Sequence, residues 1–73
     1  MLKTLRKNKK ELIGKNIHIL FSYETPVAYY DVLSDQYFVT DEHYSKSTTQ
    51  HINSWVDKSR VKQCSQDVLD NLI

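Results

Sequence analysis

One alternating segment in the first half of the chain constrains the fold more than any other feature. Ile17, Ile19 and Phe21 stand at every second position, and β-branched and aromatic residues are enriched up to about residue 23. A period of two is typical of a strand with one buried face, so we predict a strand over residues 17–23. Pro26 cannot donate to a strand ladder, and we expect the chain to turn or bulge there.

Further segments have the composition of short strands. Residues 27–32 and 37–40 are rich in aromatic and β-branched residues, and the turn-forming sequence LSDQ separates them. Three strands in succession with tight connections favour an antiparallel meander. Residues 61–64 are expected to form a brief extended link or an edge strand.

A helix is predicted after the third strand. Ser47 and Gln50 have the spacing of a capping box, in which each side chain satisfies a backbone N–H of the first turn. The neighbouring hydroxyls leave Ser45 and Thr48 as competing caps. The helix is therefore expected to begin near residue 48 and to extend to about residue 58.

The apolar positions indicate how the helices pack. Ile52, Trp55 and Val56 form one stripe of the first helix, which can cover a face of the sheet. After Ser65, a second helix over about residues 66–72 has Leu69 on its apolar face. We expect Ser47, Gln50, Ile52, Trp55 and Val56 to be structural residues.

The first fifteen residues are strongly basic, because six cations face only Glu11: Lys3, Arg6, Lys7, Lys9, Lys10 and Lys15. Apolar residues at Leu2, Leu5 and Leu12, with Gly14 as a C-cap, favour a short helix. Repulsion between like charges one turn apart favours an extended arm instead.

Together these elements predict an α+β fold. We expect a small three-stranded antiparallel meander packed by a capped helix (about 48–58) and a C-terminal helix (about 66–72), with a short N-terminal helix as an option. In domain terms, residues 1–15 are a basic N-terminal helix or arm, and residues 16–73 form a single α+β domain.

Length and spacing argue against an enzyme. A chain of 73 residues buries only about 60 % of the surface of its unfolded form, so a deep pocket is difficult to build. His18, His43, His51 and Cys64 lack the paired spacing of a zinc site. We therefore expect no catalytic residues, no cofactor and no metal. No apolar run approaches the roughly 18 residues of a membrane span, and a lone cysteine fits a reducing compartment.

Three motifs carry a resemblance to a known group of proteins. The sequences SYETPVAYYD, YFVTDEHYS and STTQHINSWV are similar to a pattern of SYxTPVA and YSxTTxxHIxxW in small uncharacterised proteins of phages, archaeal viruses and related mobile elements. That family usually has a glycine where Ser34 and Asp35 stand, and the basic segment has no counterpart in it. The resemblance implies a viral accessory protein, and it carries no biochemical activity with it. We expect the protein to be located in the cytoplasm of the infected or producing host cell.

The first hypothesis is a module that binds a host or phage protein. The middle of the chain is acidic and aromatic, and interfaces favour amphipathic aromatic side chains. The candidate partner-binding residues are Glu24, Tyr29, Asp31, Tyr37 and Asp41. The oligomeric state is open, with a homodimer among the options.

The alternative hypothesis is nucleic-acid binding. Cations could contact phosphates while Tyr29 and Tyr37 stack on single-stranded bases. The candidate residues are Lys3, Arg6, Lys7, Lys9, Lys10, Lys58, Arg60 and Lys62. Acidic residues among the same aromatics would repel phosphate, so protein binding is the first choice.

Overall fold

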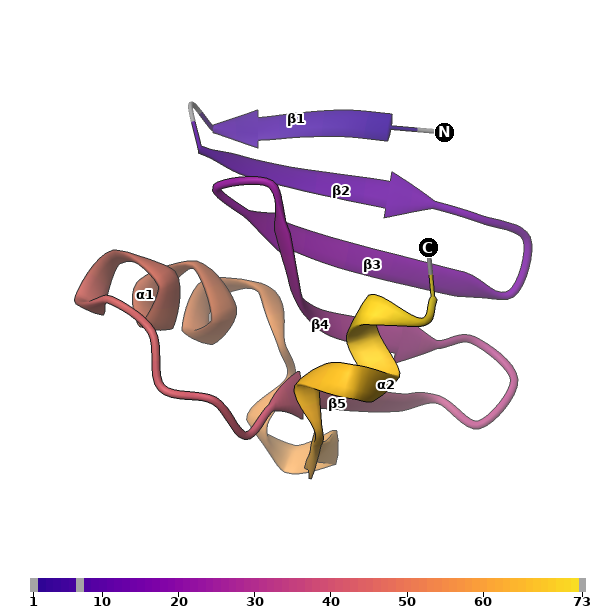
Figure 1. Ribbon diagram of the computed structural model, residues 1–73. Coiled ribbons are helices and arrows are strands. Elements are labelled where there is room, and N and C mark those ends of the chain that lie inside the picture. The colour runs from indigo at the N-terminus through magenta and orange to yellow at the C-terminus, as the bar shows by residue number, and fades with distance from the viewer. Residues whose placement is uncertain (1, 7, 73) are drawn as a thin grey trace.

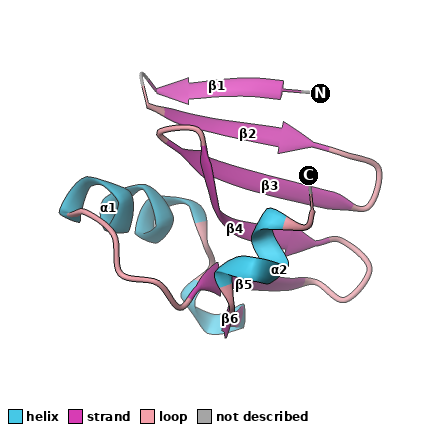
Figure 2. Cartoon of the chain, in the orientation of Figure 1, coloured by secondary structure: helices cyan, strands magenta, loops and turns pink. Residues whose placement is uncertain are grey.

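A computed structural model describes residues 2–6 and 8–72, which form a single sheet with two short α-helices (Figures 1 and 2). The strands are β1 (Leu2–Arg6), β2 (Lys9–Ile13), β3 (Ile17–Ser22), β4 (Thr25–Asp31), β5 (Gln36–Thr40) and β6 (Val61–Cys64). The helices are α1 (Lys46–Trp55), the 3-10 turn η1 (Lys58–Arg60) and α2 (Gln66–Asp70). Described strands follow one another across the sheet in the order β1-β2-β3-β4-β5-β6.

Strand directions explain where the helices lie in the sequence. Neighbours from β1 to β5 are antiparallel, whereas β5 and β6 are parallel. Antiparallel neighbours can be joined by short turns, but parallel neighbours need a long crossover, usually a helix. Here α1 and η1 form that crossover between β5 and β6.

The predicted three-stranded meander is wrong, because the sheet is larger and mixed. The segments 17–23, 27–32 and 37–40 do form β3, β4 and β5. However, β1 and β2 extend the sheet beyond β3, and β6 adds a parallel edge strand beyond β5. Of the two forms expected for residues 61–64, an extended link or an edge strand, the structure has the edge strand.

The N-terminal residues form a hairpin, so the predicted N-terminal helix is wrong. In a strand, neighbouring side chains point to opposite faces, which separates the like charges of Lys9 and Lys10. Leu12 pairs with Ile19, and the Glu11 carboxylate lies 3.2 Å from the His18 imidazole. These cross-strand contacts are not available to an isolated helix.

Gly14 has a different role from the one that the sequence predicts, whereas Pro26 has one of the two roles predicted for it. Gly14 caps no helix and has no positive φ, but its N–H donates to the Ile17 carbonyl at 2.8 Å. A Cβ there would lie 3.2 Å from that oxygen, so the close approach favours glycine. Pro26 lies inside β4, opposite Phe21, where Val27 is an extra residue. The chain therefore bulges at Pro26, which removes the need for its missing N–H.

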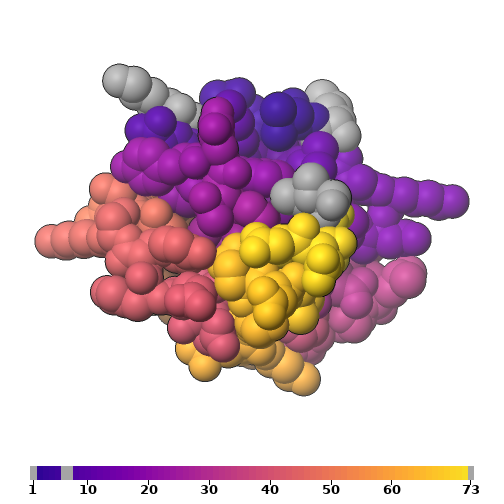
Figure 3. All heavy atoms as spheres, in the orientation of Figure 1, coloured from indigo at the N-terminus to yellow at the C-terminus, as the bar shows by residue number. Residues whose placement is uncertain are grey.

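The two α-helices contact opposite faces of the sheet. Alternation along β3 places Leu20 and Ser22 on one face, where Ser22 bonds to Thr48 and His51 of α1. On the other face, Thr40 of β5 donates to Gln66 of α2 at 2.7 Å. Figure 1 shows α2 in front of β4 and β5, and Figure 3 shows its yellow atoms lying over magenta ones.

The core lies mainly between the sheet and α1. Leu20, Val27 and Ala28 form a buried cluster, and six half-buried residues pack against it: Leu5, Val39, Tyr44, Ile52, Trp55 and Val56. The predicted stripe of α1 therefore contacts the core, although none of its members is fully buried. Leu69 of α2 is completely buried.

The predicted capping box is wrong. The cap of α1 is Ser45, whose hydroxyl accepts from the Thr48 N–H at 3.3 Å, while Ser47 and Gln50 lie in the first turns as exposed residues. Ser45 was the competing start. It prevails because it allows Thr48 to enter the buried contact with Ser22, a tertiary partner that a local pattern does not reveal.

Candidate functional site at the β3–β4 turn

The turn between β3 and β4 has an unusual backbone. Ser22 pairs with Thr25, so Tyr23 and Glu24 form a two-residue loop, and their φ values are 54° and 75°. Two positive φ angles indicate a type I′ turn, which strongly prefers Asn-Gly. For residues with large side chains this conformation costs about 1 kcal/mol or more each.

Contacts with two other segments hold the turn in place. The Tyr23 N–H donates to the Asn8 carbonyl at 3.0 Å, which ties the turn to the β1–β2 connection. The Tyr23 ring lies 5.9 Å from the His51 ring, tilted by 35°. Its side chain nevertheless remains 51 % exposed. The turn thus presents a fixed aromatic side chain to solvent.

A buried polar network lies beneath the turn. Ser22, 2 % exposed, has its Oγ 3.0 Å from Thr48 Oγ1 and 2.8 Å from His51 Nδ1. Lys9, 6 % exposed, donates from Nζ to Ser54 Oγ at 2.6 Å. Because the Ser22 hydroxyl is buried and bonded on both sides, it joins α1 to the sheet through Thr48 and His51 and is not accessible to a substrate.

Two adjoining hollows open beside the turn, and they share Lys10, Phe21 and Glu24. One has a volume of about 240 Å³ and is also lined by Asn8 and Tyr23. The other has a volume of about 320 Å³ and is also lined by Leu2 and Leu12. We call the two together the turn hollow.

Strand register explains why these residues meet. Lys10 pairs with Phe21, and Leu2 pairs with Leu12, so side chains from β1, β2 and β3 point from the same face. The α1 contacts of Ser22 are on the opposite face, and α2 covers β4 and β5. No described residue of α1 or α2 therefore lines the turn hollow.

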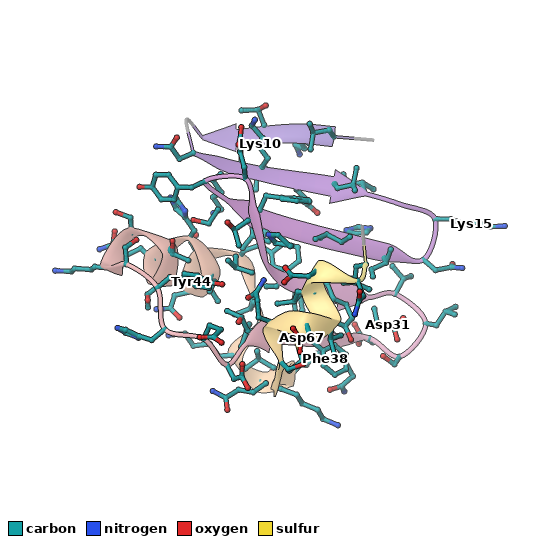
Figure 4. The ribbon with its side chains drawn as sticks, viewed as in Figure 1. Lys10, Lys15, Asp31, Phe38, Tyr44 and Asp67 are labelled. Carbon is teal, nitrogen blue, oxygen red and sulfur yellow. The ribbon has the colours of Figure 1, made fainter. Side chains whose placement is uncertain are left out.

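The turn hollow combines an apolar floor with two charges. Leu2, Leu12 and Phe21 supply the apolar surface. Among the described residues, neither Lys10 nor Glu24 has a side-chain hydrogen bond or an ion pair. Figure 4 shows Lys10 beside β1 and β2. Both charges are thus available to a binding partner.

The predicted partner-binding residues do not form one patch. Glu24 lines the turn hollow, and Asp31 holds the β4–β5 turn. Tyr29 stacks on Phe38, with ring centroids 4.7 Å apart, on one face. Tyr37 lies on the other face, edge-on to Trp55, and Asp41 is exposed just after β5. Only Glu24 lies in the turn hollow.

The predicted nucleic-acid residues are also divided. Lys3 and Lys10 belong to β1 and β2, whereas Lys62 is in β6 at the opposite edge of the sheet. Lys58 and Arg60 form part of η1, and Arg60 pairs with Asp35 at 2.6 Å. Lys9 is buried; Lys7 lies outside the described residues, and the Arg6 side chain is not described. Among the described side chains, the cations of β1 and β2 therefore form no continuous surface with those of η1 and β6.

Nothing in the described part of the chain gathers three potential metal ligands among His, Cys, Asp and Glu. Burial raises the pKa of the Cys64 thiol, and the nearby Asp41 charge adds to the shift, so the reactive thiolate is disfavoured.

No helix within residues 2–6 and 8–72 has the length and apolar character that a membrane span requires.

Several residues of the turn hollow were missed by sequence reasoning. The sequence pattern favours one side of a helix for Leu2 and Leu12, and the buried face of a strand for Phe21. Tyr23 was placed at the end of a strand. A signal would have been the two-residue loop between Ser22 and Thr25, but the loop has neither Asn nor Gly to mark it.

Comparison with known proteins identifies a family. No curated protein and no solved structure matches the chain. The sequence profile of a Family of unknown function, DUF8033, matches residues 1–71. This match covers nearly the whole chain, and the chain therefore belongs to the DUF8033 family.

Proposed function

We propose that the protein is a small non-enzymatic module that binds a partner protein through the turn hollow. The resemblance of its motifs to proteins of phages and mobile elements supports a viral accessory role, with a host or phage protein as partner in the cytoplasm. This binding surface differs from the partner-binding residues chosen from sequence alone. Of those residues, it retains Glu24 and adds Leu2, Lys10, Leu12, Phe21 and Tyr23.

The strained β3–β4 turn is the observation that carries this proposal. Tyr23 and Glu24 occupy positions where Asn-Gly would fold at lower cost. Strained backbone tends to be retained where it serves binding or catalysis, and stability is then lower than it could be. The two side chains adjoin a hollow with unpaired charges, which supplies a reason for the strain.

The composition of the turn hollow fits a protein interface. Tyr23 is an aromatic residue of the kind that contributes most to binding energy, and Phe21 and the 58 % exposed Leu2 add apolar surface. A module of this kind needs no deep cavity, in agreement with the small core. A large exposed side chain on a rigid turn also loses little conformational freedom on binding.

Capture experiments with matched variants test this proposal. Tagged protein is used to isolate partners from producing cells, with nuclease treatment, and is compared with Tyr23→Ser and Leu33→Ser. Leu33 is 79 % exposed in the β4–β5 turn, so its replacement controls for the loss of an exposed apolar side chain. We expect a partner that is retained by Leu33→Ser and lost by Tyr23→Ser, with both variants folded by circular dichroism. Equal capture by both variants would refute the proposal.

Nucleic-acid binding is the second candidate, because Lys10, Phe21 and Tyr23 lie in one hollow and could combine phosphate contact with base stacking. Glu24 lies in the same hollow and opposes phosphate. We therefore expect only weak binding to oligonucleotides, with Kd about 10⁻⁵ M or weaker at physiological salt. Submicromolar binding with a steep salt dependence, abolished by Lys10→Gln, would favour this candidate over protein binding.

A further inference from the structure

We propose that the turn hollow receives an extended peptide segment of the partner, with one large apolar side chain between an acidic and a basic one. The apolar side chain would occupy the floor, the acid would meet Lys10 and the base would meet Glu24. This inference rests on the proposed protein-binding function and specifies the chemistry of the partner.

The floor of the hollow selects the apolar side chain. Leu2, Leu12 and Phe21 come from three neighbouring strands and surround a volume of about 320 Å³. That volume is at the lower end of the range for small-molecule sites. Burying one leucine- or phenylalanine-sized side chain there removes apolar surface from water on both sides of the contact.

The two charges select the flanking side chains. Lys10 is half-buried in β2 beside the apolar floor, and within the described residues it has no anionic partner. An incoming carboxylate would pair with it, whereas an incoming cation would be repelled. Glu24 lies at the exposed turn and has the opposite preference. Opposite charges at two positions also fix the direction of the bound segment.

The position of the hollow favours an extended segment. β1 is the outermost strand in the sheet order, and Leu2 of this strand lines the hollow. A segment lying across β1 to β3 would place alternate side chains on the same side, as in any strand. The acid and the base are therefore expected two residues before and after the apolar residue.

A set of capped pentapeptides tests the charge pattern by NMR titration of the isotope-labelled full chain. The probes are acetyl-Glu-Ala-Phe-Ala-Lys-amide, the same peptide with Glu and Lys exchanged, and versions with two Glu, two Lys or two Gln. We expect one of the mixed-charge peptides to bind best, with shifts at Leu12, Phe21 and Glu24. Loss of each charge contact should weaken binding about two- to fivefold, as for exposed ion pairs.

Matched variants separate the two charges from general charge effects. Lys10→Gln should remove the preference for the mixed-charge peptide over the peptide with two Lys, and Glu24→Gln should remove its preference over the peptide with two Glu. Lys15→Gln and Glu42→Gln should preserve both preferences, because both positions are exposed outside the hollow, and Figure 4 shows Lys15 pointing away from the sheet. The spectra of the free variants verify that the fold is intact.

The outcomes distinguish this inference from the proposed function. Equal binding of all five peptides, a preference unaffected by Lys10→Gln, or no binding up to about 10 mM would overturn the charge pattern. Capture of a partner that depends on Tyr23 would then still support protein binding. If capture does not depend on Tyr23, the proposed function fails, whatever the peptides show.

Discussion

The two turns that flank β4 both contain residues with positive φ, but different contacts stabilise them. In the β4–β5 turn, Asp31 accepts hydrogen bonds from the Leu33 N–H at 3.2 Å and from the Ser34 hydroxyl at 3.0 Å. Asp35 has a φ of 56°, which aspartate tolerates better than most residues. This turn is therefore stabilised by its own side chains.

The β3–β4 turn has no such local support. Tyr23 and Glu24 both have positive φ, and the contacts of Tyr23 reach other segments, at Asn8 and His51. One turn is thus built from residues suited to its backbone, and the other holds unsuited residues in place through tertiary contacts. This difference supports our proposal that the residues of the β3–β4 turn are retained for binding, at a cost in stability.

The largest expected effect comes from giving the β3–β4 turn the residues that its backbone favours. The double variant Tyr23→Asn with Glu24→Gly should raise the free energy of unfolding by about 1–2 kcal/mol, because relief of strain outweighs the lost ring contact and the added freedom of glycine in the unfolded chain. Urea denaturation measures this change. The same variant should lose partner capture.

Ser34→Gly in the β4–β5 turn is the control for added flexibility, and it should give no gain in stability. A double variant that is less stable than the parent would show that the β3–β4 turn is not strained at Tyr23 and Glu24. The comparison between the turns would then no longer support a functional reading of these residues.

A substitution in the β4–β5 turn is expected to change the free energy of unfolding by less and in the opposite direction. Asp31→Ala removes the acceptor of two hydrogen bonds, so it should lower the free energy of unfolding by about 1 kcal/mol. Partner capture should not change. Asp41→Ala is the control, because Asp41 is exposed and holds no turn. Equal effects of the two variants in thermal unfolding would argue that Asp31 does not hold its turn.

The two turns also differ in how well sequence reasoning located them. The LSDQ sequence marked the β4–β5 turn correctly, because Ser and Asp act through local hydrogen bonds. For the β3–β4 turn, Pro26 was the strongest local signal, but the predicted turn or bulge at Pro26 lies two residues after the turn itself, and the structure has a bulge there. The turn itself follows from the pairing of Ser22 with Thr25, which depends on strand register.

The same distinction applies to the fold as a whole. Strands β3, β4 and β5, both α-helices and the short β6 could be recognised from the periodicity of their apolar residues, although the predicted cap of α1 was wrong. The hairpin of β1 and β2 could not, since Leu2, Leu5 and Leu12 also fit a helix, and only pairing of β2 with β3 decides between them. Non-local pairing therefore prevailed over local propensity at the N-terminus.

For the candidate site, sequence reasoning found the charges and missed the apolar floor. Glu24 and Lys10 were both selected, but for two different hypotheses. The structure places them in one hollow together with Phe21. Their proximity depends on the register of β2 with β3, which no pattern of residues within a single segment specifies.

The smallest expected effect is a pH dependence that arises from a hydrogen bond to the β4–β5 turn. The Tyr30 hydroxyl donates to Asp35 at 2.5 Å, and this hydrogen bond, followed by burial and the negative charge of Asp35, raises the pKa of Tyr30 above its usual value of 10.0, against an opposing effect of Arg60. A raised pKa means that the folded state favours the protonated phenol. The resulting stabilisation is complete below about pH 10 and is lost as pH rises through the higher folded-state pKa.

Tyr30→Phe lacks this titration, so its difference in melting temperature from the parent should be constant up to about pH 10 and should shrink at higher pH. In the background of Asp35→Ala the hydrogen bond is absent. There, the difference in melting temperature caused by Tyr30→Phe should not shrink above about pH 10. Thermal unfolding of the four proteins between about pH 8 and pH 12 measures both. A parallel loss of stability in the parent and in Tyr30→Phe would show that the bond from Tyr30 to Asp35 does not stabilise this turn, and the contrast with the β3–β4 turn would then rest on Asp31 alone.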